Sequence, residues 1–197
     1  PEALAELTAL AADEDAAMAA ARQRGGRVPA PAPEIGSALA WVAASLDAKT
    51  VVGVGDVAGL VGLWVLRGMR PGGMLTTISA DAADHEFARH AFQEAGIANR
   101  VRAIHGTPEE VLPRLSDGGY DLVVLGPAAD GPRQLRDHAL RLVRPGGVVA
   151  VVDVAHDDDA SRRRRLLVRE LVEDPRCQVS VLPVDAGLAL ARFAPGA

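Results

Sequence analysis

The chain has 197 residues, enough for one domain with a sizeable core, and 49% of them are hydrophobic, which excludes a disordered protein. Aromatic residues make up only 3%, so the core must consist of Ala, Val and Leu, and the stacking platforms of single-stranded nucleic-acid binders are not expected. The net charge of −5 offers no general attraction to phosphate backbones or anionic membranes. We therefore expect neither a nucleic acid nor a membrane as a partner.

The single cysteine, Cys177, cannot form an internal disulfide, which favours a reducing cytoplasm. No apolar run is long enough to span a bilayer. The acidic, Ala-rich start lacks the basic end and apolar middle of a signal peptide. The sequence therefore predicts a soluble, cytoplasmic protein.

Residues 1–32 predict a helical segment followed by a linker. Residues 2–24 favour helix, with Leu4, Leu7 and Leu10 roughly one turn apart, and a Gly-Gly pair then ends the helix. Prolines at positions 29, 31 and 33 favour an extended linker. We expect this segment to act as a lid or a subunit contact, attached to a domain over residues 33–197 that holds the only core.

From Pro33 onward, helix-favouring and strand-favouring runs alternate. We expect helices at about 33–46, 60–68, 82–95, 108–115, 133–142 and 161–172, and strands at 50–54, 75–79, 100–105, 121–125, 148–154, 178–182 and 188–193. A turn is expected at 144–147. The alternation predicts a mostly parallel sheet with helices on both faces. Too few residues separate the last two strands for a helical crossover, so they should pair antiparallel.

Two junctions carry helix-start signals. Asp81 should cap the helix that follows the second strand. Thr107, Pro108 and Glu110 form the pattern of a capping box with proline at the first helical position, where its missing N–H costs nothing. Both junctions follow strands, so they should lie at one edge of the sheet.

The most informative motif follows the first strand and reads Gly53-Val54-Gly55-Asp56-Val57-Ala58-Gly59. Glycines here let the backbone turn tightly and approach a ligand, and the next helix start supplies N–H donors. Ligands of open α/β sheets bind beyond the carboxyl ends of the strands, so residues 79–81, 106–108 and 126–130 belong to the same candidate site. A tight turn without a ligand is the alternative, because such spacing is weakly specific. Asp56 either accepts a hydrogen bond from a ligand amine or caps the next helix.

Seven segments carry a resemblance to a known family, and they occur along the chain at 50–68, 71–78, 91–97, 111–113, 120–123, 142–147 and 182–188. Together they resemble the catechol and caffeoyl-coenzyme A type O-methyltransferases over roughly residues 33–193. The resemblance implies a Rossmann-like class I methyltransferase fold, with a seven-stranded sheet whose last strand is antiparallel. It also implies S-adenosylmethionine as cofactor and a small-molecule methyl acceptor. Bacterial members are often dimers, so we expect a homodimer.

The resemblance assigns each part of the cofactor to a loop. The residues that correspond to the family's contacts with the methionine part are Gly53, Val54, Gly55, Asp56 and Gly59. Those that correspond to the wall beside the sulfonium are Gly126 and Pro127. The position that contacts the ribose is Ser79, and Ala80 corresponds to a residue beside the adenine. Asp81 is available as a substitute acid for the ribose. The other side of the adenine corresponds to Gly106, Thr107 and Pro108.

The departures from the family concern its acids. The family usually has acids where this chain has Gly53 and Ser79, and a serine cannot make the charged, two-pronged contact of a carboxylate to the ribose. Losing that bond should weaken cofactor binding by about 1.5–3 kcal/mol unless it is replaced. The family's metal ligands fall on Gly126, Val152 and Asp153, which leaves one oxygen ligand where Mg²⁺ needs several. We expect no metal there.

Without a metal, methyl transfer needs a side-chain base or an already nucleophilic acceptor. The candidate bases are Asp130, Asp153 and His156, although the first also suits a turn and the last an ordinary surface position. The family's basic lysine has no counterpart, because its position is about Ala129. The acids at 157–159 and the arginines at 162–165 predict a solvated helix start with pairs at helical spacing, rather than a phosphate site.

The sequence thus favours a metal-independent O-methyltransferase that uses S-adenosylmethionine. The combined loss at Gly53, Ser79, Gly126 and Val152 supports an alternative, a degenerate relative that serves as a binding or regulatory module. The glycine turn alone would also suit an NAD(P)-dependent oxidoreductase, which the closing strand pair and the missing acid at Ser79 disfavour.

Overall fold

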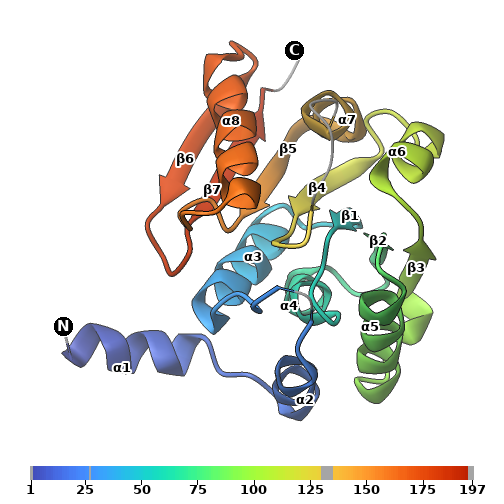
Figure 1. Ribbon diagram of the computed structural model, residues 1–197, viewed down its shortest axis with the longest axis vertical. Coiled ribbons are helices and arrows are strands. Elements are labelled where there is room, and N and C mark those ends of the chain that lie inside the picture. The colour runs from blue at the N-terminus through green and yellow to red at the C-terminus, as the bar shows by residue number, and fades with distance from the viewer. Residues whose placement is uncertain (1, 27, 130–134, 195–197) are drawn as a thin grey trace.

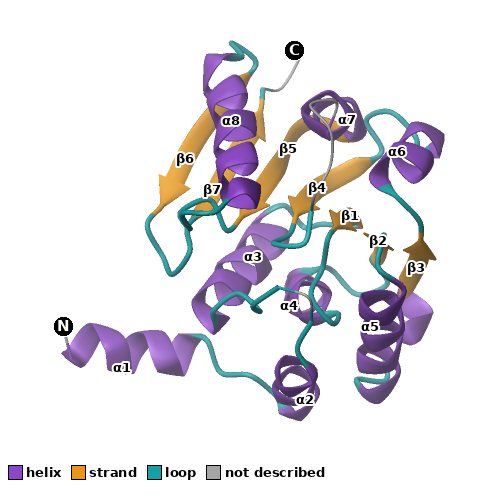
Figure 2. Cartoon of the chain, in the orientation of Figure 1, coloured by secondary structure: helices purple, strands orange, loops and turns teal. Residues whose placement is uncertain are grey.

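A seven-stranded sheet lies between two layers of helices in the computed structural model, which describes residues 2–26, 28–129 and 135–194 (Figures 1 and 2). The strands run in the order β3-β2-β1-β4-β5-β7-β6, and β7 is antiparallel to both neighbours. They are β1 (Thr50–Val54), β2 (Met74–Ser79), β3 (Val101–His105), β4 (Tyr120–Leu125), β5 (Val143–Val152), β6 (Cys177–Leu182) and β7 (Leu188–Phe193). The predicted fold and its antiparallel closing strand are confirmed.

The helices form the two covering layers (Figure 2). Those on one face are α3 (Pro33–Ser45), α4 (Leu60–Gly68) and α5 (Ala82–Glu94), and those on the other are α6 (Pro108–Val111), α7 (Leu135–Leu142) and α8 (Asp159–Glu173). The first two helices of the chain are α1 (Glu2–Ala11) and α2 (Ala16–Arg24). Two short 3₁₀ helices are η1 (Ala98–Arg100) and η2 (Leu112–Arg114). Over the described part of the chain, no helix combines the length and apolarity needed to cross a membrane.

The apolar strands are buried on both sides. In β1, Val51 packs in the core beneath α3, α4 and α5, whereas its neighbour Val52 packs in the core beneath α7 and α8. Leu122 and Val123 of β4 divide between the two cores in the same way. Because successive side chains of a strand point to opposite faces, a continuous apolar run serves both cores.

β1 lies at the switch point of the sheet, with β2 on one side and β4 on the other. Its last residue, Val54, is aligned with Ile78 of β2 and Leu125 of β4. The glycine turn and the loops after β2, β3 and β4 therefore emerge at one edge, where ligands of open α/β sheets bind. This edge holds the candidate site.

The helix predicted over residues 2–24 is in fact two helices. Asp15 caps α2, because its carboxylate accepts a hydrogen bond of 3.0 Å from the Met18 N–H. Met18 and Ala21 are buried in the core that α4 and α5 share, so α2 packs against the body of the protein. α1 projects from that body (Figure 1) and contacts it at its C-terminal end, where the Ser37 hydroxyl donates to the Ala11 carbonyl at 3.1 Å.

Two other boundaries differ from expectation. The turn predicted at 144–147 lies within β5, because Val143 pairs with Tyr120 before a register shift, and regular pairing resumes at Val148. The helix that begins at Pro108 ends as an α-helix at Val111, since a proline at position 113 has no N–H to continue the ladder.

Asp121 ties the amino ends of three strands together. Its carboxylate accepts the backbone N–H groups of Lys49 at 2.7 Å and Thr50 at 2.9 Å, and the Nε–H of Arg144 at 2.5 Å. Burial alone would raise the pKa of Asp121, but the hydrogen bonds from Arg144 and the two backbone groups outweigh it and hold the pKa below its ordinary value. The charged form therefore stabilises the fold.

We predict that Asp121→Asn lowers the free energy of unfolding by about 2 kcal/mol at neutral pH, because the amide cannot satisfy all three donors. Since the folded-state pKa is depressed, this contribution is present above the unfolded value of 3.8 and is lost as the pH falls through the folded value. Urea denaturation at several pH values measures both effects. A difference between the two proteins that stays constant into the acid range would contradict the assignment.

Candidate functional site at the carboxyl edge of the sheet

The glycine turn after β1 is packed against the loop after β4. Gly55 and Gly59 have φ angles of 71° and 81°, in the left-handed region that favours glycine. A Cβ on Gly55 would lie 2.0 Å from the Ala129 nitrogen, so only glycine allows this approach. The Ala128 N–H donates to the Gly55 carbonyl at 3.0 Å. Turn and loop therefore form one rigid unit.

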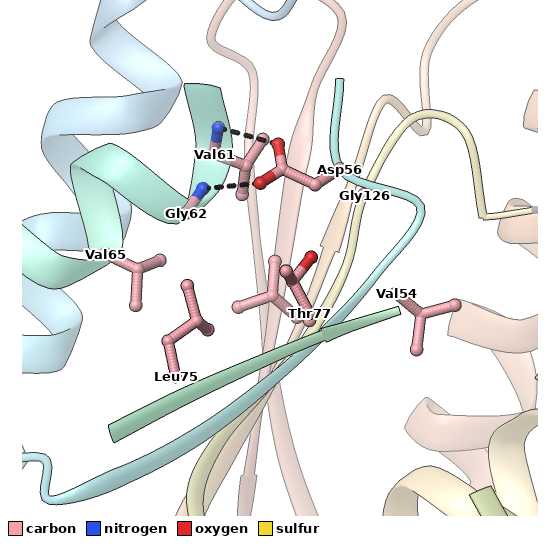
Figure 3. A pocket seen from close by; sticks show the side chains of 10 residues that line it. Val54, Asp56, Val61, Gly62, Val65, Leu75, Thr77 and Gly126 are labelled. Atoms are coloured by element: carbon pink, nitrogen blue, oxygen red, sulfur yellow. Dashed lines mark hydrogen bonds between the residues drawn. The ribbon is translucent and has the colours of Figure 1, made fainter. Parts of the chain in front are cut away.

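Asp56 points inward from the turn and caps α4 (Figure 3). Its two carboxylate oxygens accept the N–H groups of Val61 and Gly62, each at 2.9 Å. Burial raises the pKa of Asp56 to about 7, although these N–H groups act in the opposite direction, and nearby Asp84 raises it further. The capping interpretation is confirmed, and contact with a ligand amine stays a prediction.

A small pocket lies beneath the turn (Figure 3), lined in part by Gly53, Asp56, Thr77 and Gly126. It has a volume of about 10 Å³, room for one water molecule, whereas small-molecule sites measure about 300–1,000 Å³. A Cβ on Gly53 would meet no atom within 4 Å, so the place of the family's acid is open space. A cofactor would have to lie outside this pocket, over the edge of the sheet.

The N-terminal segment covers part of the turn. Gly26 lies so close that an added Cβ would be 2.8 Å from Val57 Cγ1 and 2.9 Å from Asp84 Oδ1. Val57 and Ala58 are accordingly buried. The role of residues 1–32 as a lid or a subunit contact stays a prediction.

The loops after β2 and β3 lie side by side, because Ser79 is aligned with His105 in the sheet. Ser79 is half-buried and its hydroxyl donates to the Asp81 carbonyl at 3.1 Å. The Asp81 carboxylate caps α5 as predicted, accepting the N–H groups of Ala83 at 2.8 Å and Asp84 at 3.0 Å. An acid that substitutes for the ribose ligand would have to share this capping role.

The loop after β3 is partly exposed to solvent, as is its neighbour after β2. Thr107 and Ala80 are exposed, and the Glu110 carboxylate accepts the Thr107 N–H at 3.2 Å, as the capping box predicts. Gly106 has a φ of 159°, and Pro108 is buried at the start of α6. The residues predicted to surround the adenosine thus gather at one accessible place.

The structure brings two of the three predicted catalytic residues together, and Asp130 lies outside the described residues. Asp153 follows β5 in the left-handed region, with a φ of 62°. Its Oδ1 lies 2.5 Å from Nδ1 of His156, whose side chain is half exposed. This is the geometry of an imidazole oriented by a carboxylate.

Arg164 is the residue that the sequence prediction missed. The charged helix start was expected to be solvated, and Asp159 and Arg162 are indeed exposed, paired at 2.9 Å. That prediction was wrong for Arg164, which is 5% exposed. Its position could have been found from periodicity, because the buried residues of α8 recur at helical spacing, namely Ser161, Arg164, Val168 and Leu171.

The positions that correspond to the family's metal ligands do not fit a divalent cation. Gly126 has no side chain, Val152 is buried and apolar, and the Asp153 carboxylate is paired with the Arg164 guanidinium at 2.7 Å. Within residues 2–26, 28–129 and 135–194, no group of three or more His, Cys, Asp or Glu side chains could hold a metal ion. The donor chemistry at this edge is that of an ion pair.

We predict that Asp56 makes the protein less stable as the pH rises. The folded state favours the neutral carboxyl, so stability is greatest below the unfolded pKa of 3.8 and falls until the pH passes about 7. Urea denaturation should show that the wild type loses up to about 4 kcal/mol relative to Asp56→Asn across this window. Parallel stability curves for the two proteins would show that the folded pKa is not raised.

Comparison with known proteins identifies the family. A model of the O-methyltransferase family matches residues 12–194. A protein from Mycobacterium sp. (strain JLS), provisionally assigned as an O-methyltransferase, is 41% identical over 191 residues, which cover 90% of this chain and 86% of that protein. Cofactor-bound Rv0187 from MTB has a TM-score of 0.82 at 26% identity, covering 100% of this chain and 98% of that one. The O-methyltransferase TomG from Streptomyces achromogenes, solved with SAM, shares the fold with a TM-score of 0.77 at 24% identity, over 92% of this chain and 91% of TomG. The chain therefore belongs to the O-methyltransferase family.

Proposed function

We propose that this protein transfers a methyl group from S-adenosylmethionine to a hydroxyl oxygen of a small molecule, without a metal ion and with His156 as the general base. The observation that carries the proposal is the contact of 2.5 Å between His156 Nδ1 and Asp153 Oδ1 at the end of β5. Family membership supplies the reaction class, and the SAM bound to TomG supports the choice of methyl donor.

The cofactor lies across the carboxyl edge of the sheet in this proposal. The residues that would hold its methionine part are Gly53, Val54, Gly55, Asp56 and Gly59, and Gly126 and Pro127 would lie beside its sulfonium. Its adenosine part would be held by Ser79, Ala80, Asp81, Gly106, Thr107 and Pro108. Bound S-adenosylmethionine supplies an electrophilic methyl group on sulfur. Gly26, which packs closely against Val57, would lie beside the methionine end.

His156 accepts the proton of the acceptor hydroxyl. Asp153 accepts the Nδ1–H of the ring, which leaves the Nε2 lone pair available as the base. As the acceptor oxygen forms its bond to the methyl carbon, its proton passes to Nε2 and the electrons of the broken S–C bond remain on sulfur. Alignment of the acceptor with the methyl group provides much of the rate in such a transfer.

The proposal extends to the protein's surroundings. The exposed Leu7 and Leu10 of α1 support a homodimer formed through this helix. The single Cys177, half-buried and free, suits a reducing compartment such as the cytoplasm.

We expect S-adenosylhomocysteine to bind the wild-type protein, and Ser79→Asp to bind it about ten- to a hundredfold more tightly. The reason is that a carboxylate at the tip of β2 can accept hydrogen bonds from both ribose hydroxyls, a gain of about 1.5–3 kcal/mol. Isothermal titration calorimetry measures both affinities.

Ser79→Asn is the matched control, because it has the size of aspartate without the charge and should give little gain. No binding by the wild type at millimolar ligand would exclude the proposed cofactor. Binding that Ser79→Asp fails to improve would favour the binding or regulatory module instead.

We expect His156→Gln to reduce kcat by about 10²–10⁴-fold, the usual contribution of a general base. Transfer of a labelled methyl group to a panel of small phenols measures the effect. His90→Gln is the control, because His90 is an exposed histidine on α5, away from the end of β5, where it contacts Glu94 of the same helix at 3.3 Å.

Activity of the wild type should be unchanged by EDTA. Loss of activity in EDTA with recovery in Mg²⁺ would contradict the metal-independent reaction.

A further inference from the structure

The Arg164 guanidinium joins the two loops that follow β4 and β5. Its Nη1 donates to the Pro127 carbonyl after β4 at 2.8 Å. Its Nε donates to the Asp153 carbonyl after β5 at 2.7 Å, and its Nη2 to the Asp153 carboxylate at 2.7 Å and to Ser161 Oγ at 3.0 Å. The Arg164 side chain is 6% exposed, so these contacts are largely shielded from water.

We propose that Arg164 is an internal cation that takes the place of a divalent metal between β4 and β5 and positions Asp153 for contact with His156. The inference rests on the proposed function, in which His156 is the base. The family's metal ligands are absent at Gly126 and Val152, and the remaining acid, Asp153, has the guanidinium as its cation. Arg164 acts through Asp153, so it is a positioning residue.

The first consequence concerns the backbone of Asp153. A φ of 62° is strained for a residue with a side chain, and such strain persists only where surrounding contacts enforce it. Two hydrogen bonds do so here, because the Asp153 N–H donates to the Gly187 carbonyl at 2.9 Å and the Asp153 carbonyl accepts from Arg164. Arg164 therefore holds the conformation that places the carboxylate.

The second consequence concerns the carboxylate itself. Oδ2 is paired with Arg164, and Oδ1 faces His156 Nδ1 while also accepting the Ser161 hydroxyl at 3.3 Å. A nearly buried carboxylate without a cation would be costly, and a guanidinium offers donors on three nitrogens in a rigid fork. A lysine could not replace it, because one ammonium nitrogen cannot reach the Pro127 carbonyl, the Asp153 carbonyl and Asp153 Oδ2 from the same place.

The experiment removes the guanidinium and then returns it. In Arg164→Ala, we expect ¹⁵N NMR of the cofactor-free protein to show that His156 loses its preference for carrying the proton on Nδ1. We also expect kcat to fall at least tenfold, whereas the Kd for S-adenosylhomocysteine changes less than threefold. Guanidinium chloride at a few tens of millimolar should restore the NMR signature and most of kcat, and NaCl at the same concentration should not.

Arg162→Ala is the matched control, because Arg162 lies on the same helix but is exposed and pairs with Asp157 and Asp159. It should keep the His156 signature and kcat, with no response to guanidinium. Arg164→Lys serves as a second variant should the alanine protein fail to fold, and it should lose the signature as well.

An unchanged His156 signature in Arg164→Ala, or a lysine variant with both the signature and full kcat, would overturn the proposal. The NMR signature is measured without any methyl transfer. A failure of His156 as the base would therefore appear as an undiminished kcat in His156→Gln, and it would leave the test of Arg164 intact.

Discussion

The contact between the glycine turn and the loop after β4 connects the two halves of the candidate site. The Gly55 carbonyl accepts the Ala128 N–H, and the adjacent Pro127 carbonyl accepts the Arg164 guanidinium. Arg164 in turn holds Asp153, which contacts His156. An unbroken series of hydrogen bonds thus runs from the loop assigned to the cofactor to the proposed base. Because each step is short, and Gly55, Pro127 and Arg164 are buried, the fold sets the distance between the glycine turn and His156.

Two acids at this edge illustrate different solutions to burial. Asp56 accepts backbone N–H groups and has acidic Asp84 nearby, and burial raises its pKa to about 7. Asp153 has a guanidinium at 2.7 Å, which compensates its charge directly. The first arrangement suits a helix cap whose charge can vary with pH. The second suits a carboxylate that must orient an imidazole.

Much of the fold could be predicted because its signals are local. Short apolar strands, glycine punctuation and the caps at Asp81 and Thr107 each act within a few residues. Two of the errors came from contacts between distant segments. β5 begins early because Val143 pairs with Tyr120, and Arg164 is buried because Pro127 and Asp153 provide oxygen acceptors. A charged run looks solvated in the sequence unless its helical phase is compared with that of the apolar residues.

In the proposed reaction, the use of a guanidinium in place of a metal also constrains the acceptor. A divalent ion with exchangeable positions can bind two neighbouring oxygens of a catechol and lower the pKa of the attacking hydroxyl. Arg164 is 5% exposed and donates to protein oxygens on both loops, so it offers no such exchangeable positions to a substrate. The attacking oxygen must then be selected by the walls of the site and activated by His156. A vicinal diol has no advantage in such a site, and an acceptor with a single, well-placed hydroxyl is sufficient.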